Sequence, residues 1–219
     1  MKRLLIASSL LVTSVNLASA ADMIQTAEPP AGFIWSGGYV GLQAGYGWGK
    51  EDNGFPDNPT AQISGDVKGG LGGIYGGWNW QFNNIVAGID ANVDYSDIKG
   101  TSSNAANESL TTKLRWDGAV RGRVGYAVDQ FLIYGAGGLA FGNIDVNVFD
   151  SGGTFASARD TKAGWTIGVG TEVAFSANLI GRAEYSYTDF GKVDYTAPGG
   201  PGTVAVKTNT VALGLAYKF

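Results

Sequence analysis

The chain contains no cysteine and no histidine among its 219 residues. Without cysteine, neither disulfides nor thiolate metal sites can form. Without histidine, the commonest general base and the commonest metal ligand in proteins are both missing. The acidic stretches 51–53 and 57–58 do not supply the regular ligand spacing of a cation-binding loop. We therefore expect no catalytic site, no metal site and no cofactor.

Basic residues are also in short supply. The chain opens with two of its 15 basic residues, a short apolar stretch over 4–15 follows, and small residues precede position 21. This pattern predicts a cleaved signal peptide over residues 1–20, followed by a periplasmic N-terminal segment over 21–36. Cleavage leaves 13 of the 15 basic residues against 19 acidic ones. Such a chain has no electrostatic reason to bind nucleic acid.

Long hydrophobic runs are missing as well. The apolar stretch 4–15 is shorter than the roughly 20 residues of a membrane-spanning helix. The uncharged stretch 69–89 contains seven glycines and no 3.6-residue period, so it is interpreted as two strands around a turn. No membrane helix is predicted.

The chain has instead an alternation of apolar and polar residues with period two, which is typical of β-strands. In the stretch 113–126 every charged side chain falls on one face, whereas 131–142 is apolar on both faces and its orientation stays open. The predicted strands cover residues 39–49, 70–82, 85–96, 113–126, 131–142, 162–175, 182–188 and 210–219.

The connections between these strands alternate in length. Four are long and polar, over residues 50–69, 97–112, 143–161 and 190–206. Three are short, over residues 83–84, 127–130 and 176–178. This arrangement is typical of outer-membrane barrels. The sequence predicts an all-β fold, an eight-stranded antiparallel transmembrane β-barrel over 37–219, with short periplasmic turns and long extracellular loops.

A soluble barrel, such as a lipocalin, would show the same alternation with its apolar face inward. Three features favour the membrane alternative. Charges of both signs share one face with glycines, as expected of a narrow lumen filled by paired side chains. The chain also ends in an alternating strand that must pair with the first, because lipid cannot satisfy a free strand edge. Finally, aromatic residues gather near both strand ends, as in two interfacial girdles, at Trp80, Phe82, Tyr126, Phe175, Tyr217 and Phe219 and at Trp48, Tyr95, Trp116, Trp165 and Tyr187.

The charged face supplies the candidate site residues. We predict that a set of carboxylates and guanidiniums pairs inside the barrel, since buried charges persist only when they are paired. The alternative is that Asp90 and Asp94, four residues apart on one face, act as an acid–base pair. The predicted interior ion network consists of Asp90, Asp94, Arg121, Arg123, Arg182 and Glu184.

The stretches 179–191 and 76–82 and the ending Tyr217-Lys218-Phe219 resemble the small alphaproteobacterial outer-membrane β-barrel family. That family includes major surface antigens of Brucella-like bacteria, hemin-binding proteins of Bartonella-like bacteria and rhizobial outer-membrane proteins, and it often carries a porin label. The resemblance implies that the barrel assembly machinery reads Tyr217 and Phe219. It also raises hemin binding, for which Tyr195 is the candidate axial ligand because histidine is missing.

The function expected from these patterns is structural: the protein stabilises the outer membrane, contacts its lipid and lipopolysaccharide, and presents loops outside. The alternatives are hemin binding and a narrow channel for small solutes. Eight strands close around packed side chains, which argues against a wide pore. Enzymes among the small outer-membrane barrels resemble one another in relying on a histidine, so no enzymatic activity is expected. The partners of the loops stay open.

Overall fold

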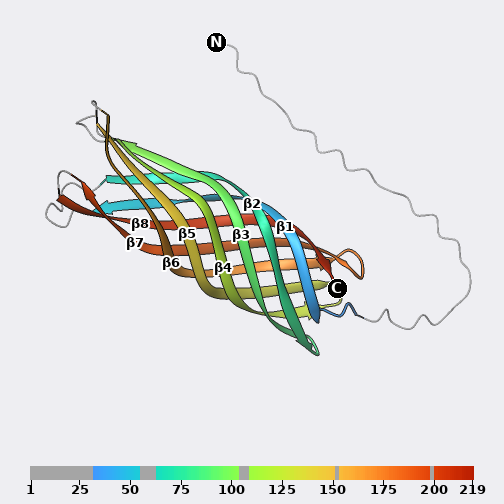
Figure 1. The fold of residues 1–219 in the computed structure, drawn as a ribbon. Helices are drawn as coiled ribbons and strands as arrows, with labels where there is room; N and C mark the ends of the chain where they lie inside the picture. Colours follow the sequence, from blue (N-terminus) through green and yellow to red (C-terminus); the bar gives the residue numbers. More distant parts are fainter. Residues whose placement is uncertain (1–31, 55–62, 104–108, 151–152, 198–199) are drawn as a thin grey trace, which may run out of the picture. The chain divides into compact units, whose positions relative to one another are not determined.

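Eight strands form one closed antiparallel barrel in which each strand pairs with the next and the last pairs with the first (Figure 1). The computed structural model describes residues 32–54, 63–103, 109–150, 153–197 and 200–219. No helix within these ranges is long and apolar enough to cross a membrane. The strands are β1 (Gly37–Gly54), β2 (Ile63–Phe82), β3 (Ile85–Ser103), β4 (Ser109–Val128), β5 (Phe131–Asp150), β6 (Gly153–Ala174), β7 (Leu179–Ala197) and β8 (Gly200–Lys218).

The closure between β1 and β8 confirms the predicted fold class. Val40 faces Tyr217 across this seam, and the amide of Phe219 donates a hydrogen bond of 3.0 Å to the carbonyl of Gly38. At the end of the barrel where the chain leaves β8, the turns are tight. Asn83 and Asp129 adopt positive φ values of 55° and 51° there. Asn and Asp tolerate this left-handed conformation better than most residues, which explains why two residues suffice for these turns.

The predicted boundaries between strand and long loop were wrong, because the strands continue well into the polar segments. β1 extends to Gly54 and β5 to Asp150, past predicted strand ends at 49 and 142. In the extension of β1, residues 50–54 are polar on both faces, so the period-two signal disappears; in that of β5, Ile144, Val146 and Val148 still alternate with polar residues, and the buried Ile144 shows that the apolar face there points into the lumen. The backbone ladder persists because it depends on amide and carbonyl groups, not on side-chain polarity. The four long connections are therefore largely extended hairpins.

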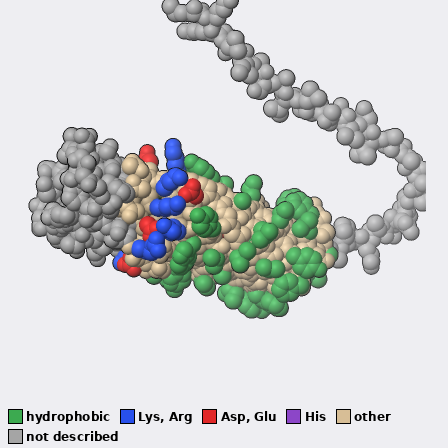
Figure 2. Space-filling model, turned by 45° about the horizontal axis from the view of Figure 1, so that its top comes forward, with side chains coloured by type: hydrophobic (Ala, Val, Ile, Leu, Met, Phe, Trp, Pro, Cys, Tyr) green, Lys and Arg blue, Asp and Glu red, His purple; other side chains and the backbone are tan. Residues whose placement is uncertain are grey.

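The apolar face of the sheet points outward, and the charged face points into the lumen. Ile133 is 69% exposed while its neighbour Leu132 is fully buried, which resolves the orientation of β5. Arg121 and Asp90 are buried on the opposite face of the sheet. Figure 2 shows the resulting hydrophobic outer surface, with a band of charged side chains beyond it.

Two predicted inward residues, Lys113 and Arg115, point outward, so the assignment of every charge in 113–126 to one face was wrong. The pairing of β4 with β5 shifts between Leu114 and Trp116, which marks a β-bulge. A bulge inserts one extra residue and so reverses the inward–outward parity beyond it. Thr112 and Leu114 are consequently buried, while the Arg115 side chain is half-exposed.

Candidate functional site

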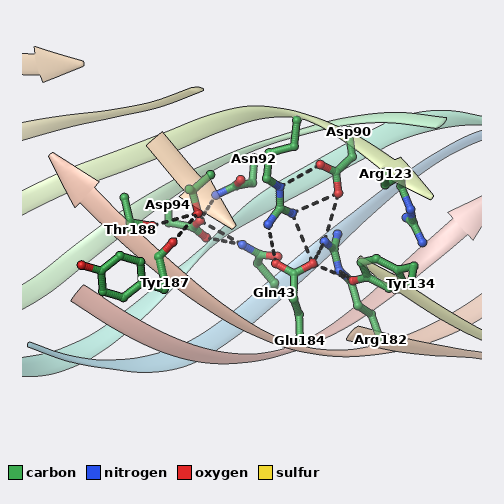
Figure 3. A network of polar contacts seen from close by, with 12 residues as sticks. Gln43, Asp90, Asn92, Asp94, Arg123, Tyr134, Arg182, Glu184, Tyr187 and Thr188 are labelled. Atoms are coloured by element: carbon green, nitrogen blue, oxygen red, sulfur yellow. Dashed lines mark hydrogen bonds and ion pairs between the residues drawn. The ribbon is translucent and has the colours of Figure 1, made fainter. Parts of the chain in front are cut away.

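The centre of the lumen holds a network of two guanidiniums and two carboxylates (Figure 3). Arg121 donates to both oxygens of Asp90 at 2.9 and 3.0 Å, and to both oxygens of Glu184 at 2.6 and 3.3 Å. Arg182 donates to Asp90 at 3.0 Å and also contacts Glu184. These four residues come from β3, β4 and β7, so the network spans the lumen rather than one strand pair. Four of the six residues of the predicted network therefore lie in direct contact.

Tyrosine side chains complete this network. The Tyr134 hydroxyl accepts a hydrogen bond of 2.7 Å from Nε of Arg182 and donates one of 2.6 Å to Glu184. The guanidinium of Arg182 also lies over the ring of Tyr75, 4.6 Å from its centroid. Such cation–π contacts gain strength when the cation is removed from water. The tyrosines thus provide both hydrogen bonds and polarisable surface to a cation that is 5% exposed.

Arg123 belongs to a second ion pair that the sequence did not predict. Its Nη1 donates to Glu172 on β6 at 2.9 Å and to the hydroxyl of Tyr39 on β1 at 2.8 Å. Its guanidinium also lies 3.9 Å from the centroid of the Tyr134 ring. Tyr134 therefore links this pair to the central network. Glu172 lies on the polar face of the alternating stretch 162–175, but parity alone does not identify a partner across the lumen.

The assignment of Asp94 to the ion network was wrong. Both of its oxygens accept hydrogen bonds from the Gln43 amide at 2.9 Å, and Asn92 contributes a third at 2.5 Å. Asp94 lies four residues beyond Asp90 on the same face of β3, where the amides of Gln43 and Asn92 contact it instead of the guanidiniums. In the part of the chain that the structure describes, Asp94 makes no ion pair.

A cavity of about 40 Å³ lies beside Asp94, with room for roughly three water molecules at ~10–15 Å³ each. Asp117 and Asp94 share its wall with hydroxyl groups of Thr166, Thr188 and Thr208. Asp90 accepts guanidinium donors on both oxygens, so it presents no free carboxylate for acid–base chemistry with Asp94. The described geometry supports the structural interpretation of these residues over the catalytic one.

Apolar clusters close the lumen on both sides of the ionic layer. One cluster, near the tight turns, contains Trp35, whose amide donates to Gln81 at 2.7 Å. The other lies toward the extended hairpins and is centred on Phe190 and Ile144, which are 2% and 0% exposed. Asp90 lies between Val86 of the first cluster and Ile98 of the second along β3. The lumen is therefore filled at three successive levels.

The remaining predicted site residues are placed as follows. The side chains of Tyr217 and Phe219 are exposed on the outer face at the β8 end, 58% and 67% respectively. Tyr195 lies in β7 opposite Gly202, but its side chain is outside the described part of the chain. The structure thus gives no contact for the candidate hemin ligand.

A closed antiparallel barrel with an apolar, aromatic-edged outer face and an ionic interior is a transmembrane β-barrel of the outer-membrane type. The chain belongs to the family of the outer membrane protein beta-barrel domain, whose family model matches residues 8–219. The predicted family resemblance is thereby confirmed, and the protein is an outer-membrane protein.

Curated relatives agree with this assignment along the whole chain. The 31 kDa outer-membrane immunogenic protein of Brucella melitensis is 36% identical over 241 residues, covering 100% of both chains. The 25 kDa outer-membrane immunogenic protein of Brucella abortus is 33% identical over 227 residues, covering 100% of this chain and 99% of the relative. The 22 kDa outer membrane protein of Rhizobium leguminosarum bv. viciae is 36% identical over 190 residues, with 87% and 80% coverage.

Solved structures share the fold at low sequence identity. The outer membrane protein OprG of Pseudomonas aeruginosa matches with a TM-score of 0.61 and 11% identity, covering 84% of this chain and 96% of OprG. The outer membrane protease OmpT of Escherichia coli matches with a TM-score of 0.51 and 10% identity, covering 85% and 98%. At these identities the likeness concerns the fold alone, since one fold supports different functions.

Proposed function

We propose that this protein is a structural barrel without enzymatic activity. It stabilises the outer membrane and presents, at the cell surface, the segments that connect the two strands of each extended hairpin. The observation that supports this most directly is the filled lumen, with an ionic layer between two apolar clusters. The relatives named as immunogenic outer-membrane proteins support a surface location of those segments. We also propose export through cleavage after residue 20; of the predicted periplasmic segment 21–36, Trp35 instead packs into the apolar cluster at the tight-turn end of the lumen.

The energetics of the ionic layer argue against a constitutive channel. Conduction requires a continuous aqueous path, and such a path through this lumen requires displacement of Arg121, Arg182 or Arg123. Each of these guanidiniums is buried and paired. Separation of a buried pair leaves an uncompensated charge, which costs about 3–5 kcal/mol. A closed barrel is therefore the dominant state.

Planar bilayer recording tests this proposal. The refolded mature barrel is expected to insert without producing uniform unitary current steps, because the ionic layer and the apolar clusters fill the lumen and the cavity beside Asp94 holds only a few water molecules. Folding of the same preparation is checked by gel mobility before and after boiling. Reproducible steps of one size from the folded fraction would contradict the structural role and favour the alternative of a narrow solute channel.

The proposed partners are the lipid and lipopolysaccharide of the outer membrane and, during biogenesis, the barrel assembly machinery. The outward aromatic ring at Tyr217 and the terminal Phe219 are accessible for such recognition before the seam with β1 closes. Hemin binding at Tyr195 stays a prediction, since the side chain of this residue lies outside the described part of the chain.

A further inference from the structure

A row of charged residues crosses five neighbouring strands of the outer face in direct register. Lys68 on β2 faces Lys99 on β3, and Lys99 faces Lys113 on β4. Lys113 in turn faces Asp145 on β5, which faces Arg159 on β6. Residues in direct register point to the same side of the sheet. The row therefore presents four cations and one anion on one side of the barrel.

Two carboxylates hold the row together without neutralising it. Asp145 accepts hydrogen bonds from Arg159 at 2.6 Å and from Arg115, and these contacts lower the pKa of Asp145 below its usual range. Asp97 lies between Lys113 at 3.2 Å and Lys99 at 3.4 Å. Each carboxylate is thus shared by two cations. The Arg159 side chain is still 60% exposed and that of Lys99 61%, so both keep donors for a ligand.

The direct pairings of Lys68 with Lys99 and of Lys99 with Lys113 do not stabilise the fold by themselves. Strands lie about 4.8 Å apart, and like charges directly opposite each other on a sheet are destabilising. The chain as a whole carries a net charge of −4, so an excess of cations on one side is not a consequence of composition. An anionic ligand that contacts several members of the row would offset this repulsion.

The opposite side of the barrel carries a balanced row at the corresponding strand ends. Asp66 on β2 faces Lys50 on β1, Lys50 faces Lys207 on β8, and Lys207 faces Asp189 on β7. This row contains two anions and two cations. Among the side chains that the structure describes, the cationic excess therefore lies on β2 through β6, and the balanced row provides an internal control.

The cationic row lies just beyond the aromatic girdle at the end of the hydrophobic band. Lys99 follows the exposed Tyr95 by four residues, and Lys113 precedes the exposed Trp116 by three, or about 10–13 Å along a strand at ~3.3 Å per residue. Figure 2 shows charged side chains in this position, next to the hydrophobic surface. Aromatic girdles mark the level of lipid headgroups.

We propose that this row binds the phosphate groups of lipopolysaccharide in the outer leaflet. The proposal rests on the proposed function, because it requires the extended hairpins to face the cell exterior. At headgroup depth the lipid supplies phosphates, which lysine recognises as a point charge and arginine through several N–H donors. The ligand is held at the barrel surface while its acyl chains contact the outward apolar residues.

The direct test is binding of diphosphorylated lipid A to the refolded barrel in detergent, compared with the same lipid after dephosphorylation. The double substitution Lys99→Gln/Lys113→Gln is expected to weaken binding of the diphosphorylated lipid about 30-fold, or about fivefold per lysine. The matched control, Lys50→Gln/Lys207→Gln, removes the same charge from the balanced row and is expected to bind like the unaltered protein. Arg115 and Arg159 are left in place, because their removal unpairs Asp145.

The proposal would be overturned if both double substitutions weakened binding of the diphosphorylated lipid equally, or if neither did. Equal binding of the dephosphorylated lipid would also overturn it, as would binding of inorganic phosphate alone with the same affinity. A second measurement needs no variant: binding by the unaltered barrel must weaken as salt concentration rises, since the contacts are exposed to solvent. Salt-independent binding would contradict a phosphate site. Bilayer conductance of the same preparations tests the structural role separately, so the two failures are distinguishable.

Discussion

Replacement of Arg182 by Met is expected to destabilise the folded barrel by about 3–5 kcal/mol, because Asp90 and Glu184 then share Arg121 as their one guanidinium and one buried negative charge is left uncompensated. Arg182 bridges Asp90 and Glu184 and accounts for one of the two positive charges of the central network. Met occupies a similar volume, so the loss of charge dominates over the loss of packing. The free energy of unfolding in urea, measured in lipid vesicles or detergent, gives the value.

Two further variants separate the network from a general effect of removing a cation. Lys162→Met breaks a partly exposed pair with Asp160 at 3.0 Å and is expected to change the free energy of unfolding by less than about 1 kcal/mol. The double variant Arg182→Met/Asp90→Asn removes one charge of each sign and leaves the pair of Arg121 and Glu184 at 2.6 Å intact. It is expected to be more stable than Arg182→Met alone. Equal effects of Arg182→Met and Lys162→Met would refute the structural role of the network.

Replacement of Val120 by Arg is expected to destabilise the barrel by about 2–4 kcal/mol, the cost of a basic side chain near the middle of a bilayer. Val120 is 58% exposed and lies on β4 between the aromatic residues Trp116 and Tyr126. In a soluble barrel an exposed valine tolerates such a change within about 0.5 kcal/mol. The substitution therefore distinguishes lipid from water at this surface.

The measurement compares urea unfolding of Val120→Arg and Val120→Leu in vesicles, where Val120→Leu keeps the surface apolar. The leucine variant is expected to match the unaltered protein within about 0.5 kcal/mol. A matching stability of the arginine variant would mean that this face does not contact hydrocarbon, and the placement of the barrel would be wrong.

The fold could be predicted from the sequence because period-two alternation survives wherever one face meets lipid and the other a packed lumen. In β3, the outward Ile89 and Val93 and the inward Asp90 and Asp94 follow this rule without exception over the predicted stretch. The rule fails beyond the membrane. The extension of β1 is polar on both faces and carries no alternation, whereas that of β5 alternates in the reverse sense, with the apolar Ile144 buried inside and polar residues outside.

The candidate site was only partly predictable, because parity gives the face of a residue but not its partner across the lumen. Asp90 and Arg121 could be found since they are register partners on neighbouring strands. Arg123 and Glu172 come from β4 and β6, which are not neighbours in the sheet. Their contact depends on the diameter and stagger of the closed barrel, which the sequence pattern does not encode.

The bulge in β4 shows a second limit of the sequence pattern. The stretch from Lys113 to Trp116 alternates as well as any regular strand, and only the shift in pairing to β5 reveals the extra residue. That shift moves Lys113 and Arg115 to the outer face, where Lys113 belongs to the cationic row and Arg115 contacts Asp145. A local irregularity of the backbone thus creates the proposed lipid-binding surface.

The central claim is that the apolar outer face contacts hydrocarbon while charged side chains fill the lumen. Since the chain has no cysteine, single fluorescent labels can be placed by Val120→Cys in the hydrophobic band and by Lys99→Cys in the cationic row. In vesicles, the label at position 120 is expected to be quenched by brominated acyl chains and protected from aqueous iodide, and the label at position 99 is expected to show the reverse. Iodide quenching at position 120, with no effect of brominated lipid, would contradict the account.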